Sequence, residues 1–258
     1  MKLAISGKGG AGKSTLAAAL TLLLARRGQR VLAVDADPDA NLASALGVSS
    51  LEQGKIIPIA RQAALIEERT GAKVRQYGQI FKLNPEVSDI ADRFAYLHRG
   101  VALLVLGAVG QGGGGCACPE NVLLRALVTD LVLYQNDALI LDMEAGVEHL
   151  GRATSGGVDC MIVVVEPGQR AVESTRRILR LARDIGLKDI RLVANKVADP
   201  PDERFLRESF PEESFLAVIP YREEFRRADR DGSSVLDGLT PDLLICFEEI
   251  LNRLEKPT

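Results

Sequence analysis

The sequence lacks the features that would send a chain into or across a membrane. No stretch approaches the ~20 consecutive apolar residues of a membrane-spanning helix. The opening residues, MKLAISGKGG, pass through only a few apolar positions before a glycine loop, so they do not supply the apolar core of a signal peptide. These absences predict a cytoplasmic protein with no membrane partner.

Neither sign of charge dominates, and histidine and cysteine are scarce. The 32 basic and 35 acidic residues give a net charge of −3, so we expect no nucleic-acid partner. The two histidines, His98 and His149, have no metal-ligand spacing and are expected to be structural. Four unevenly placed cysteines do not make a disulfide framework. Cys160 and Cys246 are expected to be small core residues.

Short apolar runs alternate with helical patterns along all 258 residues, and no linker or repeat interrupts them. Such alternation predicts one α/β domain over residues 1–258, with a mostly parallel sheet covered by helices on both faces. The segment Leu51–Arg99 is the least regular and is expected to be a helical excursion. The predicted strands are Leu3–Ile5, Val31–Val34, Val101–Leu106, Ala138–Leu141, Met161–Val165, Ile190–Ala194 and Leu216–Ile219. The predicted helices are Ser14–Arg27, Asn121–Leu133, Ala171–Ile185 and Asp202–Phe210.

A phosphate-binding loop lies between the first strand and the first helix. Its sequence GKGGAGKS fits G-x-x-x-x-G-K-[ST], in which glycines turn backbone N–H groups toward phosphate oxygens at a helix N-terminus. Lys13 would reach the β- and γ-phosphates of ATP, and Ser14 would ligate Mg²⁺. The predicted nucleotide-binding residues here are Gly7, Lys8, Gly9, Gly10, Ala11, Gly12, Lys13, Ser14 and Thr15.

The second lysine of this loop is the more informative one. From Lys8 to Ser14 the loop reads K-G-G-x-G-K-[ST], and so it resembles the deviant Walker A ATPases, the group of MinD, ParA and the nitrogenase iron protein. The resemblance implies an ATPase that works as a homodimer with ATP buried in the interface. It also implies that Lys8 crosses to the nucleotide of the facing subunit, as an arginine finger does.

Carboxylates follow two of the predicted strands at the edge where ligands bind. Asp35 and Asp37 follow the second strand, where carboxylates can hold Mg²⁺ waters and orient the attacking water. The resemblance assigns the water-positioning role to Asp37. Asp142 ends an apolar strand in the Walker B form and would hold a Mg²⁺-bound water. Glu144-Ala145-Gly146 resembles the second switch of these ATPases, although Glu144 has no assigned role.

The adenine pocket is predicted from two later segments. Asn195-Lys196 resembles the adenine-reading asparagine segment of these ATPases, because an amide can pair with both a donor and an acceptor on the base. A helix N-cap asparagine would look the same, so this alternative stays open. Pro220 and Tyr221 are expected to supply the other side of the pocket.

A Cys-x-Cys pair, Cys116 and Cys118, follows a run of four glycines. One chain offers two thiols, whereas a two-fold dimer brings together the four that a soft-metal site usually needs. The helix expected to begin at Asn121 should lower the thiol pKa and favour thiolate. The alternative is a pair of idle cysteines beside a flexible loop.

Together, the phosphate loop, the switch at Asp35, the Cys-x-Cys and the run Asp142–Leu150 resemble a narrower group, the CooC-type accessory ATPases. These mature the nickel sites of carbon monoxide dehydrogenase and acetyl-CoA synthase, and both client enzymes stay open here. The resemblance implies that ATP forms the dimer, that the dimer holds one Ni²⁺ with Zn²⁺ competing, and that hydrolysis releases the metal.

Two other functions are weighed against this one. An iron–sulfur electron-transfer ATPase like the nitrogenase iron protein has its second cysteine after the Walker B aspartate, where this chain has Glu144-Ala145-Gly146. A positioning ATPase on membrane needs a basic amphipathic tail, whereas Leu239–Thr258 is rich in glutamate. A DNA-bound version would need an arginine stripe, and the candidates are expected to form a solvated helix face. They are Arg176, Arg180 and Arg183.

Overall fold

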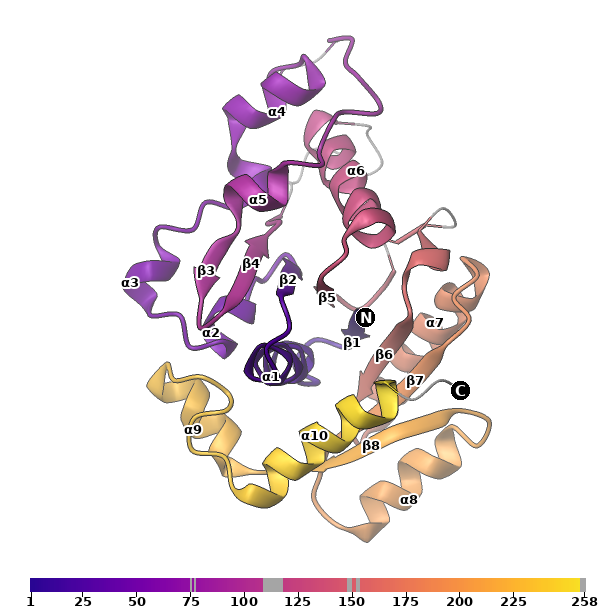
Figure 1. Ribbon diagram of the computed structural model, residues 1–258. Coiled ribbons are helices and arrows are strands. Elements are labelled where there is room, and N and C mark those ends of the chain that lie inside the picture. The colour runs from indigo at the N-terminus through magenta and orange to yellow at the C-terminus, as the bar shows by residue number, and fades with distance from the viewer. Residues whose placement is uncertain (75, 77, 109–117, 148–149, 152–153, 256–258) are drawn as a thin grey trace.

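The structure, a computed structural model, describes residues 1–74, 76, 78–108, 118–147, 150–151 and 154–255. These residues form an eight-stranded sheet in the order β3-β4-β2-β5-β1-β6-β7-β8 (Figure 1). All neighbouring strands are parallel except the β3–β4 pair at one edge. The strands are β1 (Lys2–Gly7), β2 (Val31–Ala36), β3 (Tyr96–His98), β4 (Val101–Val105), β5 (Ala138–Met143), β6 (Cys160–Val165), β7 (Ile190–Val197) and β8 (Ser214–Pro220).

Helices cover both faces of this sheet, which confirms the predicted fold class (Figure 1). The helices are α1 (Lys13–Arg26), α2 (Leu42–Ala45), α3 (Ser50–Gln53), α4 (Ala63–Thr70), α5 (Ile90–Phe94), α6 (Pro119–Tyr134), α7 (Gln169–Asp184), α8 (Pro200–Ser209), α9 (Glu223–Asp231) and α10 (Pro241–Glu255), with 3-10 helices η1 (Ile59–Arg61) and η2 (Ser155–Gly157). None of the helices described is long and apolar enough to cross a bilayer.

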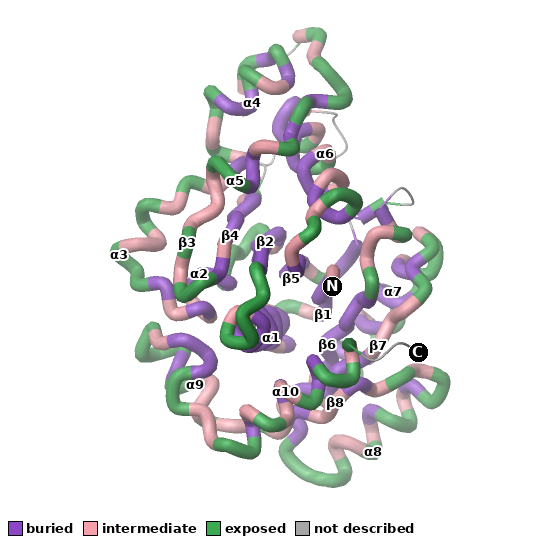
Figure 2. Tube along the Cα trace, in the orientation of Figure 1, coloured by how far each residue is buried: buried purple, intermediate pink, exposed green. Residues whose placement is uncertain are grey.

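The core has two halves, one on each face of the sheet. Successive residues of a strand point to opposite faces. Leu139 of β5 therefore lies in the core cluster that holds Leu127 of α6, while its neighbour Ile140 lies in the cluster that holds Leu20 of α1 and Phe247 of α10. The strands β1, β2, β5 and β6 are buried along almost their whole length (Figure 2). Continuous apolar runs are the sequence signature of such strands.

The irregular segment Leu51–Arg99 contains short helices, as expected of a helical excursion, but less than half of it is helical. It contains α3, η1, α4 and α5. It also contains β3, whose three residues pair antiparallel with β4 and which the sequence pattern does not predict. The predicted helix stop at Gly28 is confirmed, since this glycine has φ 79° and follows the last turn of α1.

Parallel pairing brings the carboxyl ends of the central strands to one edge. Asp142 of β5 is in register with Ile5 of β1 on one side and with Asp35 of β2 on the other. The residues that follow β1 lead directly into α1. The phosphate loop and the two predicted carboxylate segments therefore meet at this edge.

Candidate active site

The loop between β1 and α1 has the geometry that its glycines predict. Gly12 caps α1 with φ 99°, a left-handed value that favours glycine. A Cβ there would lie 2.2 Å from Nδ2 of Asn195, so the close approach of Asn195 excludes a side chain. Within the loop, the Ala11 N–H donates to the Lys8 carbonyl at 3.0 Å. The turn therefore presents its backbone at the N-terminus of a 14-residue helix, where an anion is favoured.

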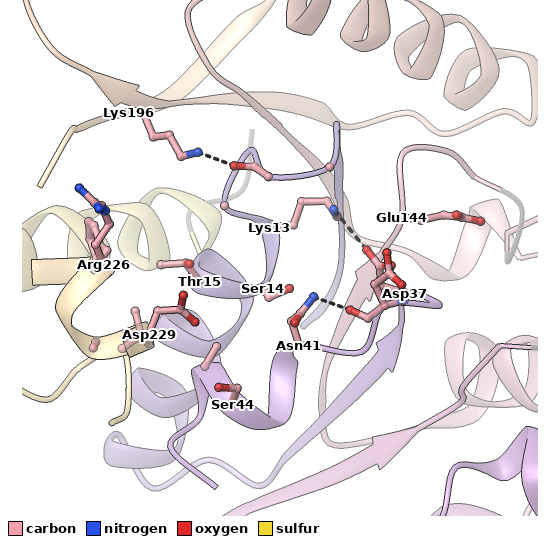
Figure 3. Close-up of a pocket in the computed structure, with 18 of the residues that line it drawn as sticks. Lys13, Ser14, Thr15, Asp37, Asn41, Ser44, Glu144, Lys196, Arg226 and Asp229 are labelled. Atoms are coloured by element: carbon pink, nitrogen blue, oxygen red, sulfur yellow. Dashed lines mark hydrogen bonds and ion pairs between the residues drawn. The ribbon is translucent and has the colours of Figure 1, made fainter. Parts of the chain in front are cut away.

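Two residues at the end of β7 donate hydrogen bonds to the phosphate loop. Asn195 Nδ2 donates to the Ala11 carbonyl at 2.7 Å, and Lys196 Nζ donates to the Gly10 carbonyl (Figure 3). Lys196 lines the cavity described below, whereas the buried Asn195 is not among its lining residues. Adenine reading by Asn195 stays a prediction, and the structure adds a loop-supporting contact that the sequence did not indicate.

Lys13 and Asp37, which both line the cavity described below, form an ion pair. Lys13 Nζ lies 3.3 Å from Asp37 Oδ2, and the two side chains are 7% and 15% exposed (Figure 3). The structure thus brings together the two residues that the sequence assigns to the γ-phosphate and to the attacking water. Asp37 Oδ1 also accepts from the Asp39 N–H at 3.0 Å, which shapes the turn after β2.

Asp35 and Asp142 are fully buried beneath this pair. Asp35 accepts from the N–H groups of Leu42 at 2.9 Å and Asp37 at 3.3 Å, so it orders the segment that leads into α2. Burial, with the neighbouring Asp142 charge, raises the pKa of Asp35 to about 7. Burial also raises the pKa of Asp142 to about 6, against the opposing effects of Ser14 and Lys13.

Asp142 fits a divalent cation. Among the residues described, neither of its carboxylate oxygens has a hydrogen-bond partner of normal geometry, although both are buried. Buried acceptors without partners are costly unless a ligand satisfies them. Ser14, the predicted Mg²⁺ ligand, lines the adjacent cavity. Ser14 and Asp142 are therefore the residues that could hold Mg²⁺.

Ser6 ties the second switch segment to β1, a role that no sequence motif signals. Its fully buried Oγ lies 2.7 Å from the Glu144 carbonyl and 3.1 Å from the Gly146 carbonyl. The Gly146 N–H donates back to Ser6 Oγ at 3.3 Å. The backbone expected to sense the γ-phosphate is thus anchored one residue before the phosphate loop.

An open cavity of about 570 Å³ joins these groups, within the ~300–1,000 Å³ typical of small-molecule sites. One wall is the phosphate loop with Thr15, and another carries Glu144 and Ala145 (Figure 3). The far wall was missed by sequence reasoning because no nucleotide-binding motif marks α9 or α2. Its cavity-lining residues, on and after α9 and around α2, are Asn41, Ser44, Ala45, Phe225, Arg226, Ala228, Asp229, Ser233 and Val235. Pro220 and Tyr221 do not line it, and the Tyr221 hydroxyl contacts Glu223 at 3.2 Å.

Of the predicted metal ligands, Cys116 lies outside the described residues and Cys118 is the N-cap of α6. The expected fall in thiol pKa is wrong for Cys118. Burial raises its pKa, outweighing the opposing hydrogen bond from the Asn121 backbone. The described parts of the chain contain no group of three metal-ligating side chains. Cys160 is buried in the core as expected, and burial raises its pKa to about 12.

In the part of the chain that the structure describes, two of the three arginines of the α7 stripe contact other segments. Arg176 donates to the Ser209 carbonyl at 3.1 Å and lies over the ring of Phe210. Arg183 pairs with Glu213 before β8. The predicted solvated face therefore helps to hold α7 against the segment between α8 and β8.

Comparison with known proteins shows the family to which the chain belongs. The model of the family described as the CobQ/CobB/MinD/ParA nucleotide binding domain matches residues 2–235. The chain is 43% identical over 237 residues to the carbon monoxide dehydrogenase accessory protein CooC of Rhodospirillum rubrum, covering 92% of this chain and 90% of that protein. It is 42% identical over 238 residues to an uncharacterized ATP-binding protein of Methanocaldococcus jannaschii, covering 91% of each.

The fold is also similar to a solved nucleotide complex. The septum site-determining protein MinD of Pyrococcus horikoshii, complexed with Mg-ADP, matches with a TM-score of 0.65 at 22% identity. The match covers 99% of this chain and 97% of that one. At this identity the likeness concerns the fold, and the residues of the site carry the chemistry.

Proposed function

The chain belongs to the CobQ/CobB/MinD/ParA nucleotide-binding family and is a P-loop ATPase, and from this premise we propose that it matures a nickel enzyme, carbon monoxide dehydrogenase or acetyl-CoA synthase. The observation that carries the proposal is the 43% identity, along nearly the whole chain, to a carbon monoxide dehydrogenase accessory protein. The chain's own Cys-x-Cys, Cys116 and Cys118, supports it.

Lys13 changes partner when ATP binds in this proposal. Its ammonium pairs with Asp37 in the structure, and the β- and γ-phosphate oxygens of ATP would compete for it. Asp37 is then free to accept a hydrogen bond from the water that attacks the γ-phosphorus. Hydrolysis breaks the bond between this phosphorus and the β,γ-bridging oxygen, giving ADP and phosphate.

Mg²⁺ would be held by Ser14 directly and by Asp142 through a bound water, because among the residues described neither buried oxygen of Asp142 has a hydrogen-bond partner of normal geometry. When bound, the ion neutralises negative charge on the phosphates. Ser6 keeps the Glu144–Gly146 backbone close to the phosphate loop. Loss of the γ-phosphate would thereby change the conformation of the segment that follows β5.

Dimerisation would link this chemistry to the metal. Lys8 would reach the nucleotide of the facing subunit, so that ATP is bound by both subunits. Two copies of Cys116 and Cys118 would supply four sulfur ligands to one Ni²⁺, the cargo, for which Zn²⁺ competes. Nucleotide then acts on the dimer equilibrium, and opening of the dimer releases the nickel.

The test measures Ni²⁺ bound per chain together with solution mass, with and without ATP. A Cys116→Ser, Cys118→Ser variant is compared with wild type. Cys246→Ser serves as the control, because it removes a thiol from α10 and leaves the Cys-x-Cys intact. We expect one Ni²⁺ for two chains, in the dimer only, lost with the Cys-x-Cys but retained in the control. An ATP-dependent dimer without cysteine-dependent nickel would contradict the nickel role, and visible absorbance from anaerobic protein would point to an iron–sulfur cluster.

A further inference from the structure

Glu166 follows β6 and lies between two lysines of the phosphate-binding region. Its Oε1 lies 3.6 Å from Lys8 Nζ, and its Oε2 lies 3.1 Å from Lys196 Nζ. Among the residues described, Glu166 is the only acidic partner of Lys8. One carboxylate therefore joins the lysine expected to act across the dimer to the lysine that holds the Gly10 carbonyl.

Lys196 is the lysine whose backbone and side-chain contacts hold Glu166 in position. It has φ 57°, a left-handed value that is unfavourable for a residue with a Cβ. The pairing between β7 and β8 is irregular at the same point. Such backbone persists where surrounding contacts stabilise it, and here the Lys196 side chain contacts Gly10 and Glu166. Glu166 is thus held in place, with its second oxygen directed toward Lys8.

We propose that Glu166 is a positioning residue that keeps Lys8 on its own subunit, and that the Lys8–Glu166 contact must break before the ATP-bound dimer forms. The inference rests on the proposed function, in which Lys8 reaches the facing nucleotide. Glu166 holds the Lys8 ammonium on its own chain, and we expect Lys8 to leave this carboxylate when it extends toward a phosphate of the facing subunit. Glu166 therefore raises the concentrations of ATP and protein that dimerisation requires.

The Lys8–Glu166 contact has a modest effect on the equilibrium of one subunit and a larger effect on the dissociation constant of the dimer. The side chains of Lys8 and Glu166 are 38% and 24% exposed, so solvent screens their attraction. A pair of this kind changes an equilibrium constant by about 1.4- to 5-fold. A two-fold dimer releases two such contacts, so their effects multiply to about 2- to 30-fold in its dissociation constant.

The first measurement is the dimer dissociation constant, from sedimentation with a non-hydrolysable ATP analogue. Glu166→Gln removes the charge and keeps the shape, and it should tighten the dimer by about 2- to 30-fold. Glu173→Gln makes the same charge change on an exposed position of α7 and should leave the dimer within about twofold of wild type. An unchanged or weaker dimer in Glu166→Gln would overturn the proposal.

The same variants should bind ADP as monomers with the affinity of wild type, since the loop keeps its bonds to Asn195 and Lys196. A tenfold loss of ADP affinity confined to Glu166→Gln would overturn the proposal, because Glu166 would then support the loop rather than restrain Lys8.

A second measurement does not depend on dimerisation. Dilute protein without nucleotide is treated with acetic anhydride, and acetylation of Lys8 is followed by mass spectrometry. Lys8 should react about 1.4- to 5-fold faster in Glu166→Gln, while the exposed Lys55 reacts equally in both proteins. Equal rates at Lys8 would overturn the contact itself. If Lys8 reacts faster in Glu166→Gln while neither protein forms a dimer with ATP, the result would support the Lys8–Glu166 contact but would contradict the ATP-dependent dimer of the proposed function.

Discussion

Asp35 and Asp142 lie directly opposite each other on the neighbouring parallel strands β2 and β5. Both carboxyl groups are fully buried, and burial raises the pKa of each, to about 7 for Asp35 and about 6 for Asp142. Two carboxyl groups that resist ionisation at one edge form a site that favours a cation. We therefore expect the pair to link the stability of the fold to pH.

Asp142→Asn should stabilise the nucleotide-free, Mg²⁺-free protein at high pH. A carboxyl group with a raised pKa binds more protons when folded, so its contribution is most favourable below pH ~4 and is lost as pH rises through about 6. The amide removes this pH-dependent cost. We expect the free energy of unfolding at pH 8 to rise by about 1–2 kcal/mol, seen by calorimetry as a Tm higher by several degrees.

The pH dependence of this gain is its signature. The advantage should shrink steadily as pH falls from 7 to 5. Asp184→Asn, at an exposed carboxylate ending α7, should shift the Tm little at any pH. A gain in Asp142→Asn that is equal at pH 5 and pH 8 would show that ionisation of Asp142 does not cause it.

Asp37→Ala should separate nucleotide binding from hydrolysis. The substitution removes the water-orienting carboxylate and also frees Lys13 from its ion pair. We expect kcat for ATP to fall by roughly 10²- to 10³-fold while the affinity for ATP is equal or tighter, which traps an ATP-bound dimer. Steady-state turnover and equilibrium binding measure the two effects. Near-normal turnover of Asp37→Ala would show that another residue orients the attacking water.

Lys13→Ala, by contrast, should abolish nucleotide binding and ATP-driven dimerisation.

The sequence predicts the parts of this site that depend on local pattern. The phosphate loop, the strands around it and the aspartates at their ends have short-range signatures, because glycine spacing and apolar runs reflect backbone needs. Contacts between distant segments leave no such signature. The bonds from Ser6 to Gly146 and from Glu166 to Lys8 join residues far apart in sequence, and each of these residue types is ordinary at its own position.

Cys118 shows why a correct local feature can still mislead. The sequence places the thiol at the start of a helix, which is where the structure has it. The helix start alone would lower the thiol pKa, but burial acts in the opposite direction and is larger. Burial depends on how α6 packs in three dimensions, and no window of sequence around the cysteine reports that.

Ser6→Ala should weaken the response of the second switch to the γ-phosphate. The variant removes the hydroxyl that joins Gly146 and the Glu144 carbonyl to β1. We expect kcat to fall several-fold with ADP affinity nearly unchanged. Stability should fall by about 1–2 kcal/mol, because one carbonyl loses its donor and the Gly146 N–H loses an acceptor. Thr21→Val is the matched control, since its buried hydroxyl has no hydrogen-bond partner in the described structure. A loss of stability alone, with kcat intact, would limit Ser6 to a structural role.

Asn195→Ala distinguishes support of the phosphate loop from reading of the base. The Asn195 amide donates to the Ala11 carbonyl and lies where a Cβ of Gly12 would be, so removing it should loosen the loop itself. We expect ATP, GTP and tripolyphosphate to lose affinity by a similar factor, about 3- to 10-fold, since one buried hydrogen bond is lost in each case. Isothermal titration with the three ligands measures this pattern. A loss specific to ATP, with tripolyphosphate unaffected, would instead assign Asn195 to adenine, because only a contact with the base distinguishes the two ligands.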